Sequence, residues 1–181
     1  MPPHISLVLL VHRVEGLQPG LYLLPRTAQL SALLQPALDQ RFLCTPLIEA
    51  PPLLDLQRLS SVPTTELYRS ARSLNCHQDI AANACFALGM LAEFDSAVSA
   101  DPAAYRDLYR EAGLLGQALY LEAEGRGLRG TGIGCYFDDA FHQLIGLTDN
   151  QFQSLYHFTV GLPLDDQRIE TSLPFDLAPT P

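Results

Sequence analysis

The sequence contains no lysine: all eleven of its basic residues are arginine. This absence excludes catalysis through a lysine Schiff base, acid–base roles of lysine and the lysine of a Walker phosphate-binding loop. The charge balance is acidic as well, with a formal net charge of −9. Because nucleic-acid binding depends on clustered lysine and arginine, we expect no nucleic-acid partner.

A long apolar run is also missing. No stretch reaches the roughly 18 consecutive apolar residues of a membrane-spanning helix. The apolar residues near the start have no basic region before them, and Arg13 and Glu15 follow closely. That pattern is typical of a strand rather than of a signal peptide. We therefore expect no membrane partner and a cytoplasmic location.

The cysteines show no CxxC pair and no zinc-type spacing. There are four, namely Cys44, Cys76, Cys85 and Cys135. Without an export signal, reduced thiols are the default state, and free cysteine is most often found in protein interiors. The sequence therefore predicts four free, buried and unreactive thiols.

At 181 residues and 48% hydrophobic content, the chain suits one domain, residues 1–181, with a sizeable core. Its organising stretch is residues 105–139, which predicts a long amphipathic helix, a glycine-rich stop and a short strand. We expect Asp101 as the N-cap and Pro102 as the first helical residue. Apolar residues then recur at helical spacing, at Tyr105, Leu108, Tyr109, Ala112, Leu115, Leu119 and Ala123.

Glycines interrupt this helix and end it. Gly113 and Gly116 each cost about 1 kcal/mol relative to alanine, so we expect another backbone or a flat ligand close to this face. Gly125 and Gly127 end the helix, and with Gly130 they spell G-x-G-x-x-G. A dinucleotide-binding motif needs a strand before it and a helix after it. The order here is reversed, which favours a helix stop and a tight turn.

Strands and short helices are expected in the rest of the chain. The pattern predicts strands at residues 5–14, 21–24 and 155–160, the first two as a hairpin-like pair, and helices at residues 29–38 and 64–74.

Four further stretches give a weaker or mixed pattern. Prolines make residues 42–63 irregular or extended, and residues 78–94 fit either a helix or a buried strand. We expect Asp138 to cap a short helix that Gly146 closes, and Thr148 to cap one further turn. Residues 169–181 are expected to form an extended arm lying on the domain itself or on a partner.

Motifs for nucleophilic or metal chemistry are absent. There is no G-x-S-x-G elbow, and Cys76 and His77 are neighbours in sequence, which rarely lets a nucleophile and its base meet. The other histidines show no ligand spacing, and core or surface positions are expected for His4, His12, His142 and His157. Asp138 and Asp139 could form a metal pair, but an acidic first helical turn explains them with less. We expect no metal site and assign no catalytic residue.

Four blocks of the sequence, in order, resemble the FMN-dependent nitroreductase family. They are RVEGLQPGLYLL (residues 13–24), AGLLGQALYLEAEGRGLRGTGIG (112–134), FDD (137–139) and LYHFTVGLPLDD (155–166). Within the family, the blocks are most similar to the dehydrogenases that oxidise thiazoline and oxazoline (azoline) rings in ribosomal peptide biosynthesis. The resemblance implies an α+β fold, a three-layer α-β-α sandwich that dimerises with FMN at the interface. It also favours a strand at residues 85–91.

The resemblance implies two contacts with the cofactor. Backbone N–H groups near N5 of the flavin ring stabilise an arriving hydride, and the matching segment consists of Gly132, Ile133, Gly134, Cys135 and Tyr136. Arg168 matches a basic region that contacts the FMN phosphate, for which a guanidinium is well suited. The alternatives are a tight turn for the glycines, and an ion pair with Asp165 or Asp166 for Arg168.

The chain departs from the family pattern at both ends. The arginine-rich segment that grips the FMN phosphate before the first strand is absent, so the fold is expected to be N-terminally incomplete, as in the C-terminal part of a longer protein. At the other end, the basic cluster is reduced to Arg168 among acidic residues, a setting unfavourable for a phosphate dianion.

Two functions follow from this comparison. The first is an FMN-dependent oxidoreductase that moves hydride between FMN and a reduced nicotinamide or an azoline-type substrate. The second is a non-catalytic nitroreductase-like domain that serves dimerisation or scaffolding. In both, the expected partner is a second copy of the chain or a second nitroreductase-like domain.

Overall fold

The centre of the molecule is a seven-stranded antiparallel sheet. The computed structural model describes residues 3–48, 50–51 and 54–170. The strands are β1 (Ile5–Val11), β2 (Gly20–Leu24), β3 (Thr45–Pro46), β4 (Gln57–Ser60), β5 (Phe86–Glu93), β6 (Arg129–Ile133) and β7 (Phe152–Gly161). Their order is β3-β4-β2-β1-β5-β7-β6, and every neighbouring pair is antiparallel. β6 therefore lies at one edge.

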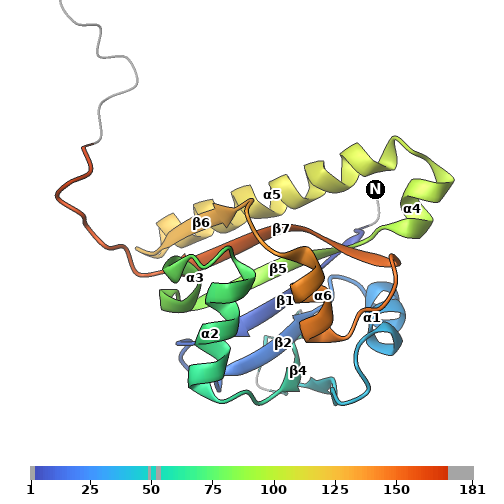
Figure 1. Cartoon of the computed structure of the whole chain (residues 1–181), viewed down its shortest axis with the longest axis horizontal. Helices are drawn as coiled ribbons and strands as arrows, with labels where there is room; N and C mark the ends of the chain where they lie inside the picture. The colour runs from blue at the N-terminus through green and yellow to red at the C-terminus, as the bar shows by residue number, and fades with distance from the viewer. Residues whose placement is uncertain (1–2, 49, 52–53, 171–181) are drawn as a thin grey trace, which may run out of the picture.

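Helices cover both faces of this sheet (Figure 1). One face carries α4 (Asp95–Ala100) and α5 (Ala104–Gly125). The other face carries α1 (Ala28–Leu34), the 3₁₀ turn η1 (Gln35–Ala37), α2 (Thr64–Leu74), α3 (Asp79–Asn83) and α6 (Asp138–Ile145). The arrangement has the three layers, and the α+β class, expected from the sequence.

Each face of the sheet has its own apolar core. Because side chains alternate along a strand, Val8 and Leu10 of β1 belong to the core under α1, α2 and α6, whereas Ile5 and Leu7 belong to the core under α5. In the part of the chain that the structure describes, no helix is long and apolar enough to cross a membrane.

Most of the predicted elements are confirmed. β1 and β2 form the expected antiparallel pair, with Leu7 opposite Leu24, and the helix predicted at residues 64–74 is α2 with the same bounds. The ambiguous stretch at residues 78–94 contains both alternatives, because α3 precedes β5. The strand favoured by the family resemblance is therefore correct for most of residues 85–91.

The long helix is confirmed as α5, but its predicted start is wrong. Asp101 is the C-cap of α4, and α5 begins only at Ala104, with Ala103 at its N-cap. The Asp101 carboxylate accepts the N–H of Ala103 at 2.9 Å, before the helix begins. The short helix α4, which was not predicted, ends at the residue expected to begin α5. The chain must therefore turn after Asp101 before α5 can start.

The predicted helix after β6 is α6. Its C-terminal end is as predicted, whereas its N-terminal end differs. Asp138 is its first residue rather than its cap, and with Asp139 it forms an acidic first turn, the simpler of the two interpretations considered for this pair. Gly146 ends the helix in a left-handed conformation, as predicted. Thr148 caps no further turn, because the chain runs on irregularly into β7.

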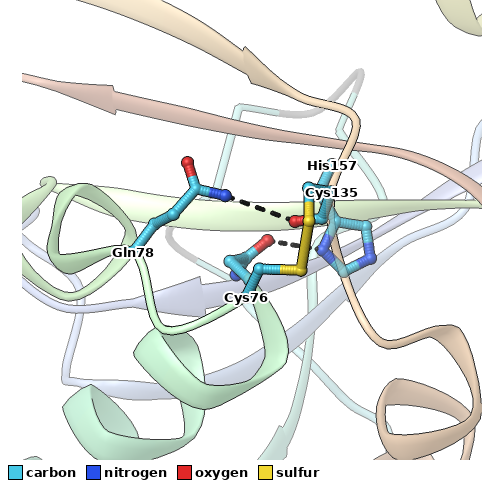
Figure 2. Close-up of a disulfide and its surroundings, with 5 residues drawn as sticks. Cys76, Gln78, Cys135 and His157 are labelled. Atoms are coloured by element: carbon cyan, nitrogen blue, oxygen red, sulfur yellow. Dashed lines mark hydrogen bonds between the residues drawn. A yellow bond between two sulfur atoms is a disulfide. The ribbon is translucent and has the colours of Figure 1, made fainter.

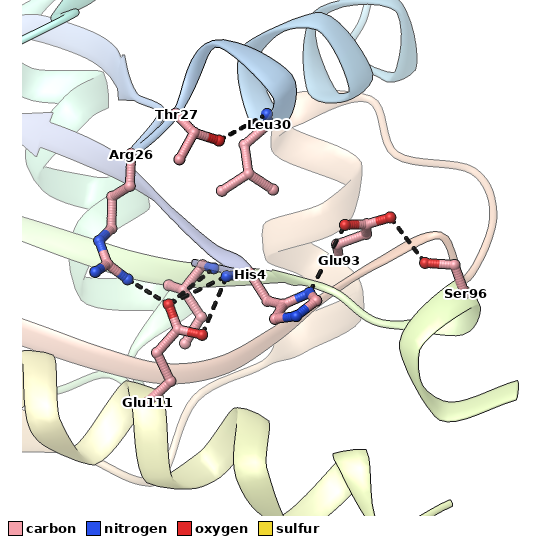
Figure 3. A network of polar contacts seen from close by, with 8 residues as sticks. His4, Arg26, Thr27, Leu30, Glu93, Ser96 and Glu111 are labelled. Carbon is pink, nitrogen blue, oxygen red and sulfur yellow. Dashed lines mark hydrogen bonds and ion pairs between the residues drawn. The ribbon is translucent and has the colours of Figure 1, made fainter. Parts of the chain in front are cut away.

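α5 is attached to the first strand through Glu111 (Figure 3). Its carboxylate accepts the backbone N–H groups of His4 and Ile5 at 3.1–3.3 Å and pairs with the guanidinium of Arg26. Since those N–H groups lie at the start of β1, the half-buried Glu111 fixes the position of the helix along the sheet.

The C-terminal segment leaves β7 without helix or strand as far as residue 170. Most of the predicted arm, residues 171–181, lies outside the described residues.

Candidate functional site

The glycines of β6 face aromatic rings on the α5 side of the sheet. A methyl group at Gly130 would lie 2.7 Å from the Phe158 ring, and one at Gly132 would overlap the Tyr156 hydroxyl. The Tyr120 hydroxyl accepts the Gly132 N–H at 2.7 Å. On this side, the side-chain-free backbone accommodates the protein's own rings and leaves no space for a flat ligand.

The two glycines inside α5 differ from each other. A Cβ at Gly116 would lie 2.8 Å from the Tyr156 ring, while a Cβ at Gly113 would meet nothing within 4 Å. The close approach expected at both positions therefore occurs only at Gly116, and the neighbour is a side chain of β7. Gly113 faces open space.

Beyond Ile133, the end of β6, the backbone turns towards solvent. Gly134 and Cys135 are exposed, and a Cβ on Gly134 would meet nothing within 4 Å. The backbone N–H groups of Gly134, Cys135 and Tyr136 donate to no residue that the structure describes. This segment therefore has three successive unpaired N–H donors, two of them on exposed residues and the third on the half-buried Tyr136.

Tyr136 is fixed against the sheet from the same segment. Its ring stacks on His157 of β7, with centroids 4.0 Å apart and planes 7° apart, and its hydroxyl donates to the Ser154 carbonyl at 3.0 Å. Burial, reinforced by the nearby charges of Tyr109 and Asp138, raises the pKa of Tyr136 to about 12. The phenol therefore stays protonated near neutral pH and serves as a hydrogen-bond donor.

A buried polar network continues from His157 and defines its tautomer. The Asn75 amide nitrogen donates to the Ala71 carbonyl at 2.7 Å, so the Asn75 oxygen accepts from Nδ1 of His157 at 2.8 Å. Nε2 of His157 is then free to accept the Ser154 hydroxyl at 3.0 Å. Burial, with the neighbouring His142, lowers the pKa of His157 to about 3, which keeps the ring neutral.

This network has the connectivity of a nucleophile, a base and an orienting residue, but not the access. Ser154 is only 6% exposed, so a substrate has little access to its hydroxyl. A nucleophile needs contact with its substrate. The network therefore positions Tyr136 and the end of β6 rather than carrying out chemistry itself.

Sequence spacing could not reveal this network. Ser154 and His157 are three residues apart, and in a regular strand they would point to opposite faces. β7 contains a bulge at Leu155, because Ser154 lies opposite Leu91 and Tyr156 opposite Met90. The extra residue places both side chains on the same face. Of the two positions expected for the histidines, core or surface, His157 occupies the core.

Cys135 forms a disulfide with Cys76, so the prediction of four free thiols is wrong (Figure 2). The Cα atoms are 5.9 Å apart, within the normal range for a disulfide. The two cysteines are separated by 59 residues, and only the fold brings their loops together. Cys44 and Cys85 are free but half-buried rather than fully buried.

A cavity of about 600 Å³ lies at the start of β6. It is lined by Ile80 and Asn83 of α3, by Thr131 of β6 and Thr159 of β7, and by residues 162–165. Arg129 also lines it and pairs with Glu124 at 2.8 Å. The cavity thus offers apolar and neutral polar surface, the acidic side chain of Asp165, and the guanidinium of Arg129, which Glu124 compensates.

Arg168 does not line this cavity, and it makes no hydrogen bond or ion pair with residues 132–136. It is exposed, and its Nε donates to the Asp166 carboxylate at 2.8 Å, which lowers the pKa of that carboxyl. The ion pair weighed as an alternative from the sequence is therefore present, with Asp166 as the partner. In the described residues, no group of three histidine, cysteine or acidic side chains could hold a metal ion.

Comparison with known proteins agrees with this fold. The chain is similar in structure to a candidate nitroreductase from Anabaena variabilis (TM-score 0.66, 24% identity, covering 89% of this chain and 27% of that chain). It is also similar to the Escherichia coli microcin synthetase McbBCD complex with truncated pro-MccB17 bound (0.60, 20%, covering 89% and 52%). The chain thus spans about a quarter to a half of the length of these proteins.

A search of curated proteins found no match. A family model gives the decisive result, because the model described as "Nitroreductase family" matches residues 19–162, which include every strand from β2 to β7 and the whole of α5. The chain therefore belongs to the nitroreductase family.

Proposed function

We propose that the chain is part of an FMN-dependent oxidoreductase that transfers hydride between FMN and a reduced nicotinamide or an azoline-type substrate. Family membership supports flavin chemistry in general. The observation that carries the proposal for this chain is the exposed segment with unpaired N–H groups at Gly134, Cys135 and Tyr136. Fixed donors beside a flavin ring stabilise the charge that develops when the ring accepts hydride.

The residues fit the ring of FMN better than its phosphate. Gly134 leaves open space beside the donors, and Tyr136 is held in place by His157 and Ser154. For a phosphate, Arg129 and Arg168 are unsuitable, because Arg129 pairs with Glu124 and Arg168 with Asp166. In this proposal the chain supplies the side of the site that faces the ring, and its residues act by positioning the ring.

The phosphate contacts come, in this proposal, from a second copy of the chain or a second nitroreductase-like domain. The outer face of α5 has apolar side chains that such a partner would cover: Leu114 is 72% exposed and Leu121 63% exposed. These two residues are seven apart, on one stripe of the helix. A neighbour of similar fold is itself part of a multi-subunit synthetase complex. A cytoplasmic location and a single domain over residues 1–181 remain predictions.

Flavin binding tests the proposal directly. Purified protein, titrated with FMN, is expected to show oxidised-flavin absorbance bands near ~370 and ~450 nm that stay with the protein on gel filtration. Gly134→Leu fills the space beside the donors and is expected to abolish this binding. Gly125→Leu places the same side chain at another glycine with open space around it and is expected to bind FMN normally.

Two outcomes would contradict the proposal. The first is a wild-type protein that takes up no FMN at saturating concentration, either alone or with a second nitroreductase-like domain. The second is equal loss of binding in both leucine variants, which would place the flavin elsewhere.

A further inference from the structure

The Cys76–Cys135 disulfide joins two loops that belong to different parts of the fold. Cys76 follows α2, and Cys135 follows β6 (Figure 2). Two further contacts join the same loops: the Gln78 amide donates to the Cys135 carbonyl at 3.3 Å, and the Phe137 N–H donates to the Leu74 carbonyl at 2.8 Å. We call residues 74–78 and 134–137, with these contacts, the clamp.

The two sulfur-bearing residues differ in accessibility. Cys135 is exposed, whereas Cys76 is half-buried. Thiol–disulfide exchange proceeds by attack of a thiolate on the sulfur that it can reach, and the other sulfur departs. An incoming thiol will therefore attack Cys135, and Cys76 will be the leaving group.

The loop that carries Cys76 is held in an unfavourable backbone conformation. Cys76 has φ +51° and the following His77 has φ +59°, values that non-glycine residues adopt rarely and at a cost in free energy. Asn75, the residue immediately before, holds Nδ1 of His157. Opening the disulfide removes one restraint on this strained loop, and the change reaches the ring on which Tyr136 stacks.

We propose that Cys76–Cys135 is a reversible thiol–disulfide exchange site for low-molecular-weight thiols of the glutathione type, and that its redox state controls the order of the clamp. The thiolate forms a bond to Sγ of Cys135, the protein S–S bond breaks, and Cys76 leaves as a thiolate that takes a proton from water. A second small thiolate then attacks the small-molecule sulfur of the mixed disulfide and releases Cys135. Two electrons pass from two small thiols to the protein, and the products are one small disulfide and two protein thiols.

The exchange is reversible because the loops stay together without the disulfide. The backbone bond between Phe137 and Leu74 does not involve sulfur, so both thiols remain neighbours after reduction. Attack by Cys76 on a mixed disulfide at Cys135 is then intramolecular, which gives it a high effective concentration. This inference does not depend on FMN binding.

Trapping the mixed disulfide tests the direction of attack. In a Cys44→Ser/Cys85→Ser background, which removes the two other thiols, oxidised glutathione is added to the Cys76→Ser and Cys135→Ser variants, and intact mass is followed with time. Cys76→Ser is expected to gain one glutathione per chain at least about tenfold faster than Cys135→Ser, because access limits the rate. Equal rates, or faster modification of Cys76, would overturn the assignment.

Reduction of the wild-type protein tests the effect on the clamp without any substitution. Reduced glutathione is added under native conditions, and amide hydrogen exchange is compared before and after. Exchange is expected to increase at the two hydrogen-bonded loop amides of the clamp, Gln78 and Phe137, by more than it does in α5, and oxidised glutathione is expected to restore it. A disulfide that resists native reduction, unchanged exchange in the clamp, or general unfolding would each refute the proposal.

Discussion

The strand β6 and the segment that follows it use the same glycine-rich sequence for different purposes. Towards α5, Gly130 and Gly132 are covered by the rings of Tyr120, Tyr156 and Phe158, so glycine is required by packing. Beyond the strand, a Cβ added to Gly134 would meet nothing within 4 Å, and the neighbouring N–H groups are unpaired among the described residues. A glycine-rich segment therefore identifies a binding surface only where its backbone donors are free. The following predictions test this contrast, from the largest effect to the smallest.

Loss of the Cys76–Cys135 disulfide, in the segment after β6, should have the largest effect on stability. Cys135→Ser removes a cross-link that closes a loop of 59 residues, and chain entropy then favours the unfolded state by about 4 kcal/mol. For a domain of this size, we expect Tm to fall by about 10 °C. Differential scanning calorimetry of oxidised protein measures this shift. Cys85→Ser is the control, and an equal shift in that variant would rule out the cross-link as the cause.

On the α5 side, Gly132→Ala should destabilise the fold by about 3 kcal/mol, because the new methyl group overlaps the Tyr156 hydroxyl and overpacking of this kind costs about 1–3 kcal/mol. Gly134→Ala, two residues away, should change stability by less than about 0.5 kcal/mol. Urea unfolding of the pair measures the difference. Equal effects would show that the two glycines do not differ in their surroundings as described.

The buried histidines should make the fold sensitive to acid. Burial lowers the pKa of His157 to about 3 and of His12 to about 4, below the ordinary value near 6.5. Below pH 6.5 the unfolded state therefore binds more protons than the folded state. The free energy of unfolding is then highest above about pH 6.5 and falls as pH drops towards the pKa of the folded state. Each histidine lowers the free energy of unfolding by up to about 1.4 kcal/mol per pH unit. Urea unfolding between pH 7 and 5 should show this decline, and His157→Gln should reduce its slope; a stability that is flat or rises towards pH 5 would contradict it.

The smallest effect is a gain in stability within α5. Gly113→Ala replaces a mid-helix glycine with open space around it, so we expect stabilisation by about 1 kcal/mol. Gly116→Ala makes the same replacement three residues later, where the Tyr156 ring lies 2.8 Å from the new Cβ, and is expected to destabilise. Thermal unfolding of both variants compares them. Stabilisation by both would mean that the Tyr156 ring moves away easily.

The elements that depend on local sequence could be predicted, whereas contacts between distant segments could not. α2 has the predicted bounds because its apolar spacing and the preceding Pro63 are local signals. The Cys76–Cys135 pair depends on two loops that meet only in the folded chain. Similarly, Ser154 and His157 share a face only because Leu155 is an extra residue in β7. The glycines of residues 130–134 were identified as important, but whether each was packed or free depended on rings from α5 and β7.

The hydroxyl of Tyr120 has a consequence for how the molecule behaves at high concentration. The Gly132 N–H points away from β7, towards the free edge of β6, and Tyr120 accepts it there. An edge strand with unpaired donors is a template on which strands of other molecules can add. By occupying this donor with a side chain of α5, the protein removes one position at which a foreign strand could pair, and so protects the end of its sheet against aggregation.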